Sequence, residues 1–278
     1  MGRPRGRPFL LDLMKILGIL NITEDSFSDG GKYLAPGTAL VQADRLLSEG
    51  ADILDLGAAS SHPDAKPVPP EIEIARLKPL VPALHDLGAS LSIDTFSLPV
   101  QRWALEQGVD YLNDIHGFAD PALYPDLAAS NAKLIVMHMV QQDGIATRTD
   151  IPAMEVFDRI LTFFEKRLTA LTQAGVAPER LILDPGMGFF LSTDPQASLM
   201  VLGRLPELAE AFGLPLLVSV SRKSFLKALA RPDGPADASV AAEMFAVAQG
   251  ADYIRTHAPA PLREGLEVLE SLENRNNR

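Results

Sequence analysis

Charged and amide side chains follow almost every short apolar segment of this chain. In chain order they are Asn21, Asp55, Asp94, Asn113, His138, Asp184, the run Ser221–Lys223, Arg255 and His257. Carboxylates and amides can accept hydrogen bonds from the N–H groups of a polar heterocycle, whereas arginine, lysine and histidine can donate to phosphate oxygens. One such residue often serves only to anchor a loop. So long a series predicts that several of them meet in one binding site.

Two stretches of the chain carry the clearest chemistry. The run SRKS at 221–224 follows the apolar segment 214–220 and opens a predicted helix, where free N–H groups and the helix dipole favour an anion. Asp184 ends another apolar segment, and a buried carboxylate there needs a partner such as Lys223 or a ligand N–H. The sequence DPGMGFF begins at Asp184 and brings two adjacent aromatic rings. We predict that these rings form a ligand wall.

Two further loops have the composition of phosphate-binding segments. Residues 21–33 read NITEDSFSDGGKY, with three carboxylates, several hydroxyls and a glycine pair that can order around a metal–phosphate group. The segment is not a P-loop, because it lacks the first glycine and has Tyr33 where Ser or Thr is needed. Residues 57–64 read GAASSHPD, small enough for a close backbone approach to a ligand. A mobile polar loop and a tight turn are the respective alternatives.

The elements that must position these residues alternate regularly. Eight apolar segments of strand type lie at 16–20, 53–56, 91–93, 111–112, 134–137, 181–183, 214–220 and 253–254. Helical apolar faces lie between them, for example over 39–47 and 156–171. The repeat Gly-Xaa-Asp followed by two apolar residues begins at Gly50, Gly108 and Gly250. This pattern predicts a single α/β domain, a (β/α)8 TIM barrel over 15–278 preceded by an N-terminal extension over 1–14, with a doubly wound open sheet as the alternative.

Composition excludes several classes of function. The 278 residues carry a net charge of −11, which argues against nucleic acid or an anionic membrane as partner. The absence of cysteine excludes disulfides, thiolate zinc sites and iron–sulfur clusters. No apolar run reaches the roughly 18 residues that a membrane helix needs. The basic N-terminus has Asp12 within its apolar stretch and no small-residue cleavage site, so we predict a flexible extension and a cytoplasmic protein.

Taken together, the motifs resemble those of dihydropteroate synthase, a family of the folate pathway, from Lys15 to the end of the barrel. The matching segments, in order, are GILNITEDSFSDGG, GADILDLG, SIDTF, YLNDIHGF, VMHM, LDPGMGF, SVSRKSF and IRTH. The resemblance implies a transferase that joins 6-hydroxymethyl-7,8-dihydropterin pyrophosphate to p-aminobenzoate and releases pyrophosphate. It also implies Mg²⁺ as cofactor, small-molecule substrates as partners and a homodimer.

The resemblance also assigns roles to individual residues. Asn21 would bind Mg²⁺, and the catalytic residues would be Asp94, Asp184, Lys223 and Arg255. Pterin and pyrophosphate would be bound by those four and by Ser61, Asn113, Met137 and His257, with Arg255 stacking on the pterin. The p-aminobenzoate would be bound by Pro63, Phe189, Arg222 and Ser224. The chemistry agrees, because a pterin edge presents N–H donors to carboxylates and a carbonyl to lysine.

The chain departs from the usual family pattern in the second and sixth loops. His62 stands where an arginine is common, and Phe190 and Leu191 follow Phe189 where the family commonly continues with Gly-Lys. The strings ASSHPDA, NDIHGF, DPGMGFFLS, LPLLVSVSRKSFL and DYIRTHAP resemble the Sul-type, sulfonamide-insensitive branch. We predict sulfonamide insensitivity, with Phe189 and Phe190 excluding a drug that is bulkier than p-aminobenzoate. A drug-sensitive synthase, a pterin-binding methyltransferase domain and a non-catalytic pterin binder are the alternatives.

Overall fold

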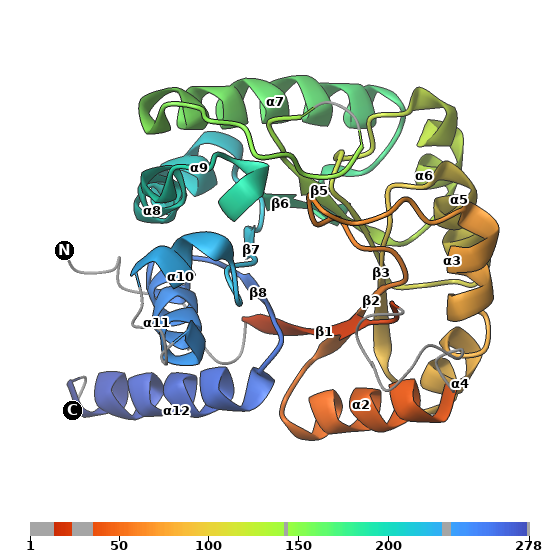
Figure 1. Cartoon of the computed structure of the whole chain (residues 1–278), viewed down its shortest axis with the longest axis horizontal. Helices are drawn as coiled ribbons and strands as arrows, with labels where there is room; N and C mark the ends of the chain where they lie inside the picture. The colour runs from red at the N-terminus through yellow and green to blue at the C-terminus, as the bar shows by residue number, and fades with distance from the viewer. Residues whose placement is uncertain (1–13, 24–35, 142–143, 230–234, 277–278) are drawn as a thin grey trace.

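Eight parallel strands form the centre of the molecule. The computed structural model describes residues 14–23, 36–141, 144–229 and 235–276. The strands are β1 (Lys15–Asn21), β2 (Ile53–Gly57), β3 (Ser90–Asp94), β4 (Tyr111–Asp114), β5 (Lys133–Met137), β6 (Leu181–Asp184), β7 (Leu217–Val218) and β8 (Tyr253–Thr256). Their order is β6-β5-β4-β3-β2-β1-β8-β7, and a parallel bridge between Leu183 and Leu216 joins the two ends. The sheet therefore closes into a ring (Figure 1).

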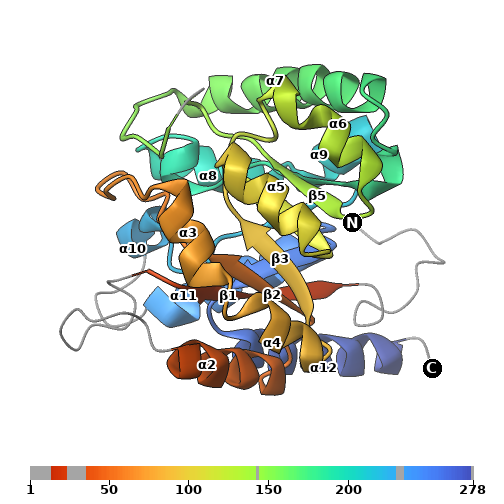
Figure 2. The same cartoon turned by 90° about the vertical axis from the view of Figure 1, so that its right-hand side faces the viewer.

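Helices surround this ring. They are α2 (Pro36–Ser48), α3 (Pro70–Leu77), α4 (Val81–Asp86), α5 (Leu98–Glu106), α6 (Tyr124–Ala129), α7 (Ala153–Gln173), α8 (Pro195–Gly203), α9 (Leu205–Phe212), α10 (Ser224–Leu229), α11 (Pro235–Ala248) and α12 (Pro259–Asn276). Figure 2 shows α7 on the opposite side of the barrel from α2 and α12. The predicted (β/α)8 barrel is confirmed. Within the described residues, every helix is too short or too polar to cross a lipid bilayer.

Burial explains why the apolar segments become strands. All five residues of β2 are buried, as expected for a strand that has helices on one side and the barrel interior on the other. One set of strand side chains fills the barrel: Leu17, Ile53, Tyr111, Ile135, Ile182, Leu217 and Tyr253. The longer segment predicted over 214–220 is regular only at Leu217–Val218. Pro215 has no N–H to donate, although its carbonyl accepts from Leu183 N at 2.9 Å.

The Gly-Xaa-Asp repeat has a structural role at the barrel floor. Gly50 and Gly250 have φ angles of 95° and 100°, which let the chain turn from a helix into the next strand. Each aspartate of the repeat then accepts a backbone N–H from a neighbouring segment. Asp52 bonds Ile16 N at 2.8 Å, Asp110 bonds Leu91 N at 2.9 Å, and Asp252 bonds Leu216 N at 2.9 Å. The repeat thus fixes the beginnings of three strands.

The described part of the chain begins at the last residue of the predicted N-terminal extension, directly before β1. Residues 1–13 of the predicted extension lie outside the described residues. Met14, its last residue, is only 2% exposed and belongs to the hydrophobic core, so it is part of the barrel.

Candidate active site at the carboxyl ends of the strands

Most of the predicted site residues meet in one pocket above the barrel. The pocket is lined by Ser61, Asp94, Asn113, Ile115, Met137, Asp184, Met187, Phe190, Ser219, Lys223 and Arg255. Strand register explains this meeting. Asn21 pairs with Gly57, Gly57 with Asp94, and Asp94 with Asn113, so these residues form a row across three strand junctions. Gly57 keeps the space between Asn21 and Asp94 open, because a side chain there would contact both.

Arg255 is the centre of the charge network. Its Nε lies 2.5 Å from Asp55 Oδ2, and a terminal nitrogen lies 2.6 Å from Asp94 Oδ2. Asp55 is fully buried, and the side chain of Arg255 is only 15% exposed. Burial opposes the charge of Arg255, but Asp55, Asp94 and Asp184 together raise its pKa above the ordinary value. Sequence reasoning placed Asp55 at this rim but gave it no role. The structure makes it the partner that holds Arg255.

Two acids of the pocket hold their protons unusually tightly. Burial raises the pKa of Asp94 to about 7, although Arg255 acts in the opposite direction. Burial also raises the pKa of Asp184 to about 6, against the effects of the Gly186 N–H, 2.8 Å away, and of Lys223. Lys223 itself has its pKa lowered to about 8 by burial and by Arg255. The pocket therefore holds acids and a base close to titration at neutral pH, which is typical of functional sites.

Asn113 adds an unused acceptor to this pocket. The residue is 3% exposed, and its Oδ1 has no hydrogen-bond partner in the described part of the chain. A buried amide oxygen without a donor is unfavourable. Together with Asp94 and Asp184 it presents oxygen atoms that suit a ligand rich in N–H groups.

The two adjacent phenylalanines have different surroundings. Phe190 is 8% exposed, packs in a cluster with Ile115 and Met137, and lies with its ring centroid 4.5 Å from Lys223 Nζ. This distance allows a cation–π interaction. Gly188, with φ 66°, brings their loop close to Lys223 and Ser224, the side chains that a Cβ at 188 would contact. Phe190 thus lines the pocket, and a ligand wall formed by Phe189 and Phe190 stays a prediction.

Phe189 lies farther out, where three loops meet. The His62 ring packs edge-on against the Phe189 ring, with 6.2 Å between the two ring centroids. The Arg148 guanidinium carbon lies 5.5 Å from the centroid of the Phe189 ring. Arg148 also forms two bonds to Asp64, at 2.8 and 2.5 Å. Pro63 lies in the chain between His62, which contacts Phe189, and Asp64, which binds Arg148. The loops after β2, β5 and β6 are therefore tied together. Sequence reasoning missed Arg148, which no motif marks.

The run at 221–224 forms a tight turn before α10. Arg222 has a left-handed φ of 59°, and its N–H donates to Ser239 Oγ at 3.0 Å. Its side chain is exposed, whereas Lys223 is partly buried against the acids. On the neighbouring strand end, His257 Nδ1 lies 3.1 Å from Ser221 Oγ. Burial and the cations Arg222, Arg255 and Lys223 lower the pKa of His257 to about 3.

His138, unlike most of the other residues at the strand ends, does not line the pocket. It is 3% exposed, and its Nδ1 lies 3.1 Å from the Pro185 carbonyl oxygen. Burial lowers its pKa to about 4, so the ring is neutral at physiological pH. The ring packs against Phe163, outside the pocket. His138 therefore supports the loop after β6 instead of lining the site.

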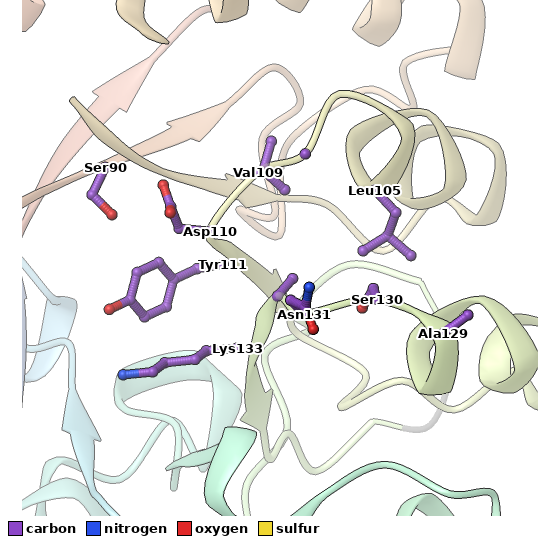
Figure 3. A pocket seen from close by; sticks show the side chains of 11 residues that line it. Ser90, Leu105, Val109, Asp110, Tyr111, Ala129, Ser130, Asn131 and Lys133 are labelled. Carbon is purple, nitrogen blue, oxygen red and sulfur yellow. The ribbon is translucent and has the colours of Figure 1, made fainter. Parts of the chain in front are cut away.

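A second pocket lies at the opposite end of the strands. Its lining includes Ser90, Asp110, Tyr111 and Lys133, and Figure 3 shows Lys133 beside the Tyr111 ring. The Asp110 carboxylate accepts a hydrogen bond from the Leu91 N–H, and Lys133 Nζ lies 5.7 Å from the centroid of the Tyr111 ring. These polar groups serve the barrel floor. Because the chemistry of TIM barrels takes place at the carboxyl ends of the strands, the upper pocket is the candidate site.

Comparison with known proteins agrees with this geometry. The family described as "Pterin binding enzyme" matches residues 17–257. "Dihydropteroate synthase type-2" of Escherichia coli is 56% identical, over 93% of this chain and 96% of that protein. "Dihydropteroate synthase type-3" of the same species is 49% identical, over 94% of this chain and all of that protein. The dihydropteroate synthase of Xanthomonas albilineans, solved with 4-aminobenzoic acid, has a TM-score of 0.85 and 33% identity, covering 95% of this chain and 94% of that one. The chain therefore belongs to the pterin-binding enzymes and, within them, to the dihydropteroate synthases, which are transferases.

Proposed function

We propose that this chain makes 7,8-dihydropteroate from 6-hydroxymethyl-7,8-dihydropterin pyrophosphate and p-aminobenzoate at the upper pocket. One observation carries the assignment of the pocket. Asn113 presents a buried amide oxygen without a donor in the described residues, next to the buried carboxyl groups of Asp94 and Asp184 and to Lys223, which can donate to a carbonyl. This arrangement is complementary to the edge of a pterin.

The reaction can be followed bond by bond at these residues. The bond between the pterin methylene carbon and the pyrophosphate oxygen breaks, and pyrophosphate leaves with the electron pair. Asp94 and Asp184 stabilise the positive charge left on the pterin. Arg255 and His257 hold the leaving phosphates at the end of β8. The neutral aromatic amine then forms the new C–N bond and loses a proton to solvent. No strong base is needed for this step.

Mg²⁺ is the cofactor we propose for pyrophosphate departure, and Asn21 would contribute its amide oxygen. Mg²⁺ in proteins often uses one or two side-chain oxygens together with substrate phosphates and water, so a single protein ligand fits its chemistry. Asn21 lies at the carboxyl end of β1, opposite Gly57. When bound, the ion would neutralise charge on the leaving group. Glu24, Asp25 and Asp29 of the same loop lie outside the described residues.

The aminobenzoate subsite would lie on the outer side of the pocket. The exposed cation of Arg222 and the hydroxyl of Ser224 suit the carboxylate of the substrate. Phe189 and Pro63 suit its aromatic ring. In support of this assignment, the loop that carries Pro63 is joined to the loop after β5, where Ala146 N donates to the Ser61 carbonyl oxygen at 3.1 Å, and Arg148 of that second loop lies against the Phe189 ring.

We propose further that the enzyme is insensitive to sulfonamides because Phe189 and Phe190 narrow the drug's path. Phe189 is fixed between His62 and Arg148, so it would resist displacement by a bulky substituent. We expect Phe189→Gly or Phe190→Gly to lower the inhibition constant of sulfamethoxazole. Phe190→Gly should also raise the KM for the pterin substrate, since Phe190 contacts Lys223. Unchanged inhibition in both variants would refute this explanation.

The decisive experiment measures dihydropteroate formation with Mg²⁺ across a sulfamethoxazole titration. Turnover that persists with drug in large excess over p-aminobenzoate supports both proposals. Turnover that the drug abolishes leaves the synthase activity standing and refutes insensitivity. Pterin binding without Mg²⁺-dependent turnover would instead favour a non-catalytic pterin binder.

A homodimer in the cytoplasm completes the proposal. Adjacent helices α11 and α12 carry the exposed apolar side chains Phe245, Val268 and Leu272, which support a subunit contact there. Sedimentation should give twice the monomer mass of 30.0 kDa, and Val268→Asp should shift it toward the monomer. A monomeric wild type would refute the contact. Cell fractionation tests the location.

A further inference from the structure

Glu243 is a buried acid that the proposed reaction does not use. It lies on α11 and is 1% exposed. Its carboxyl group is hydrogen-bonded to the side chain of Thr256 on β8, while Oε1 has no partner among the described residues. A buried carboxyl group with an unpaired oxygen is costly as an anion and much less costly as a neutral acid. The apolar core gains no stability from this acid, which points to a role of Glu243 in the neighbouring active site.

A path of hydroxyl groups leads from Glu243 to the active site. Thr256 Oγ1 lies 3.4 Å from Ser221 Oγ. Ser221 Oγ in turn accepts the backbone N–H of His257 at 3.2 Å and lies 3.1 Å from Nδ1 of the same residue. Each hydroxyl has one proton to donate. If Glu243 donates to Thr256, each following hydroxyl donates toward His257, and if Glu243 accepts, each donates toward Glu243.

His257 is the residue at which this direction matters. Burial and three nearby cations keep its ring neutral. A neutral imidazole carries a single N–H, either at Nδ1 or at Nε2. Nδ1 faces Ser221, so Nε2 is the nitrogen left for a ligand. The ring can donate to a phosphate oxygen only when the proton is on Nε2.

We propose that Glu243 is a positioning residue that acts through Thr256 and Ser221 to place the ring proton of His257 on Nε2, toward the pyrophosphate. As a neutral acid, Glu243 donates to Thr256, Thr256 to Ser221, and Ser221 to Nδ1. As an anion, it accepts from Thr256, the direction reverses, and Nδ1 keeps the proton. This inference rests on the proposed function, since it takes pyrophosphate as the group that His257 binds.

The surroundings of Glu243 allow its carboxyl group to change between the acid and the anion within the physiological pH range. Burial raises its pKa to about 7, and the bond from Thr256 acts in the opposite direction. The other titratable groups on the elements around α11 are Arg222, Lys223, Lys227, Tyr253, Arg255, His257, Arg263, Glu264, Glu267 and Glu270. Among these, Arg222, Lys223 and Arg255 act on His257. Arg263 is bonded to Gly50 and Asp52, and Lys227, Glu264 and Glu267 are exposed.

The test compares the KM for the pterin pyrophosphate at pH 6 and pH 8.5, with saturating Mg²⁺ and p-aminobenzoate. Loss of a hydrogen bond to the charged phosphate should raise the wild-type KM at pH 8.5 about 10-fold relative to the KM of Glu243→Gln, in addition to the changes that titration of Asp94, Asp184 and Lys223 causes in every variant. Glu243→Gln and Thr256→Val remove this pH-dependent rise, because neither variant has a titrating relay. Glu264→Gln, on the exposed face of α12, is the matched control and keeps it. Ionisation of the substrate and of Asp94, Asp184 and Lys223 affects the wild type and the three variants alike.

Two outcomes would overturn the proposal. The first is a pH dependence of KM that is the same in Glu243→Gln, Thr256→Val and the wild type. The second comes from nitrogen NMR of labelled histidine, with His257 assigned by His257→Gln. The wild-type ring should change from the Nε2–H to the Nδ1–H tautomer between pH 6 and 8.5, and Glu243→Gln should keep one tautomer. A single tautomer in the wild type refutes the relay. This readout needs no turnover, so it separates failure of the relay from failure of the proposed function.

Discussion

Binding of a pterin should release protons from the active site near pH 6.5. In the free enzyme, burial favours the neutral forms of Asp94 and Asp184. A pterin brings N–H donors to these oxygens, and a donor stabilises the ionised carboxylate more than the acid. The ligand therefore lowers the pKa of both acids, and their protons pass to the buffer.

The amount released follows from the two pKa values. With pKa values of about 7 and about 6, Asp94 is about three quarters protonated at pH 6.5 and Asp184 about one quarter. Complete ionisation on binding would release about one proton per site. At pH 7.5 the release falls to about 0.3 proton. Lys223, with a pKa of about 8, takes up a similar amount when it donates to the ligand, so the net change approaches zero.

Isothermal titration calorimetry can measure this number directly. The observed binding enthalpy of 6-hydroxymethylpterin is plotted against the ionisation enthalpy of several buffers at one pH, and the slope is the number of protons exchanged. Asp184→Asn is the control, and it should reduce the release at pH 6.5 while leaving the contribution of Asp94. A slope of zero at pH 6.5 in the wild type would mean that ligand binding leaves the protonation of both acids unchanged, which would refute the proposed proton release.

Three predictions concern stability. Arg255→Met leaves Asp55 buried without its partner and should lower the free energy of unfolding in urea by about 3–5 kcal/mol, and a loss under about 1 kcal/mol would contradict the buried pair. Gly186→Ala should prevent recovery of a native far-UV and near-UV spectrum, because Gly186 has φ 74° and a Cβ there would overlap a backbone carbonyl of the loop after β5. The native pKa values of Asp94 and Asp184 exceed the unfolded value of 3.8, so their contribution to stability is present in full below pH 4 and is lost as pH rises to 7. Urea unfolding of Asp184→Asn should show a smaller decline over this range than the wild type.

The barrel could be predicted because its signals are local. Each buried strand is a short apolar run, and the Gly-Xaa-Asp repeat gives the helix end, the turn and the first strand residue within a few positions. The row of Asn21, Asp94 and Asn113 followed from the same logic, since residues that end parallel strands must be neighbours. Strand length was less predictable. The segment 214–220 is apolar throughout most of its length, yet only two residues of it pair regularly.

The contacts that sequence reasoning missed join residues far apart in the chain. Asp55 binds Arg255 across 200 positions, and Asp64 binds Arg148 across 84. No spacing rule connects such pairs, because their contact exists only after the barrel has closed. Glu243 was hidden for another reason. On a helix it resembles any surface acid, and only the structure shows it 1% exposed behind β8.

The excess of acid in the pocket explains how stability and ligand binding are linked. Asp55, Asp94 and Asp184 outnumber Arg255 and Lys223, and the buried site reduces the imbalance by holding about one proton on its acids. A folded core alone would gain nothing from this arrangement, since a buried network of apolar side chains is usually at least as stable. The arrangement becomes favourable when a ligand supplies the missing donors, because each N–H then replaces a retained proton. The shortage of hydrogen-bond donors in the pocket therefore favours a heterocycle with several adjacent N–H groups as the ligand. The same shortage disfavours ligands that present only acceptors.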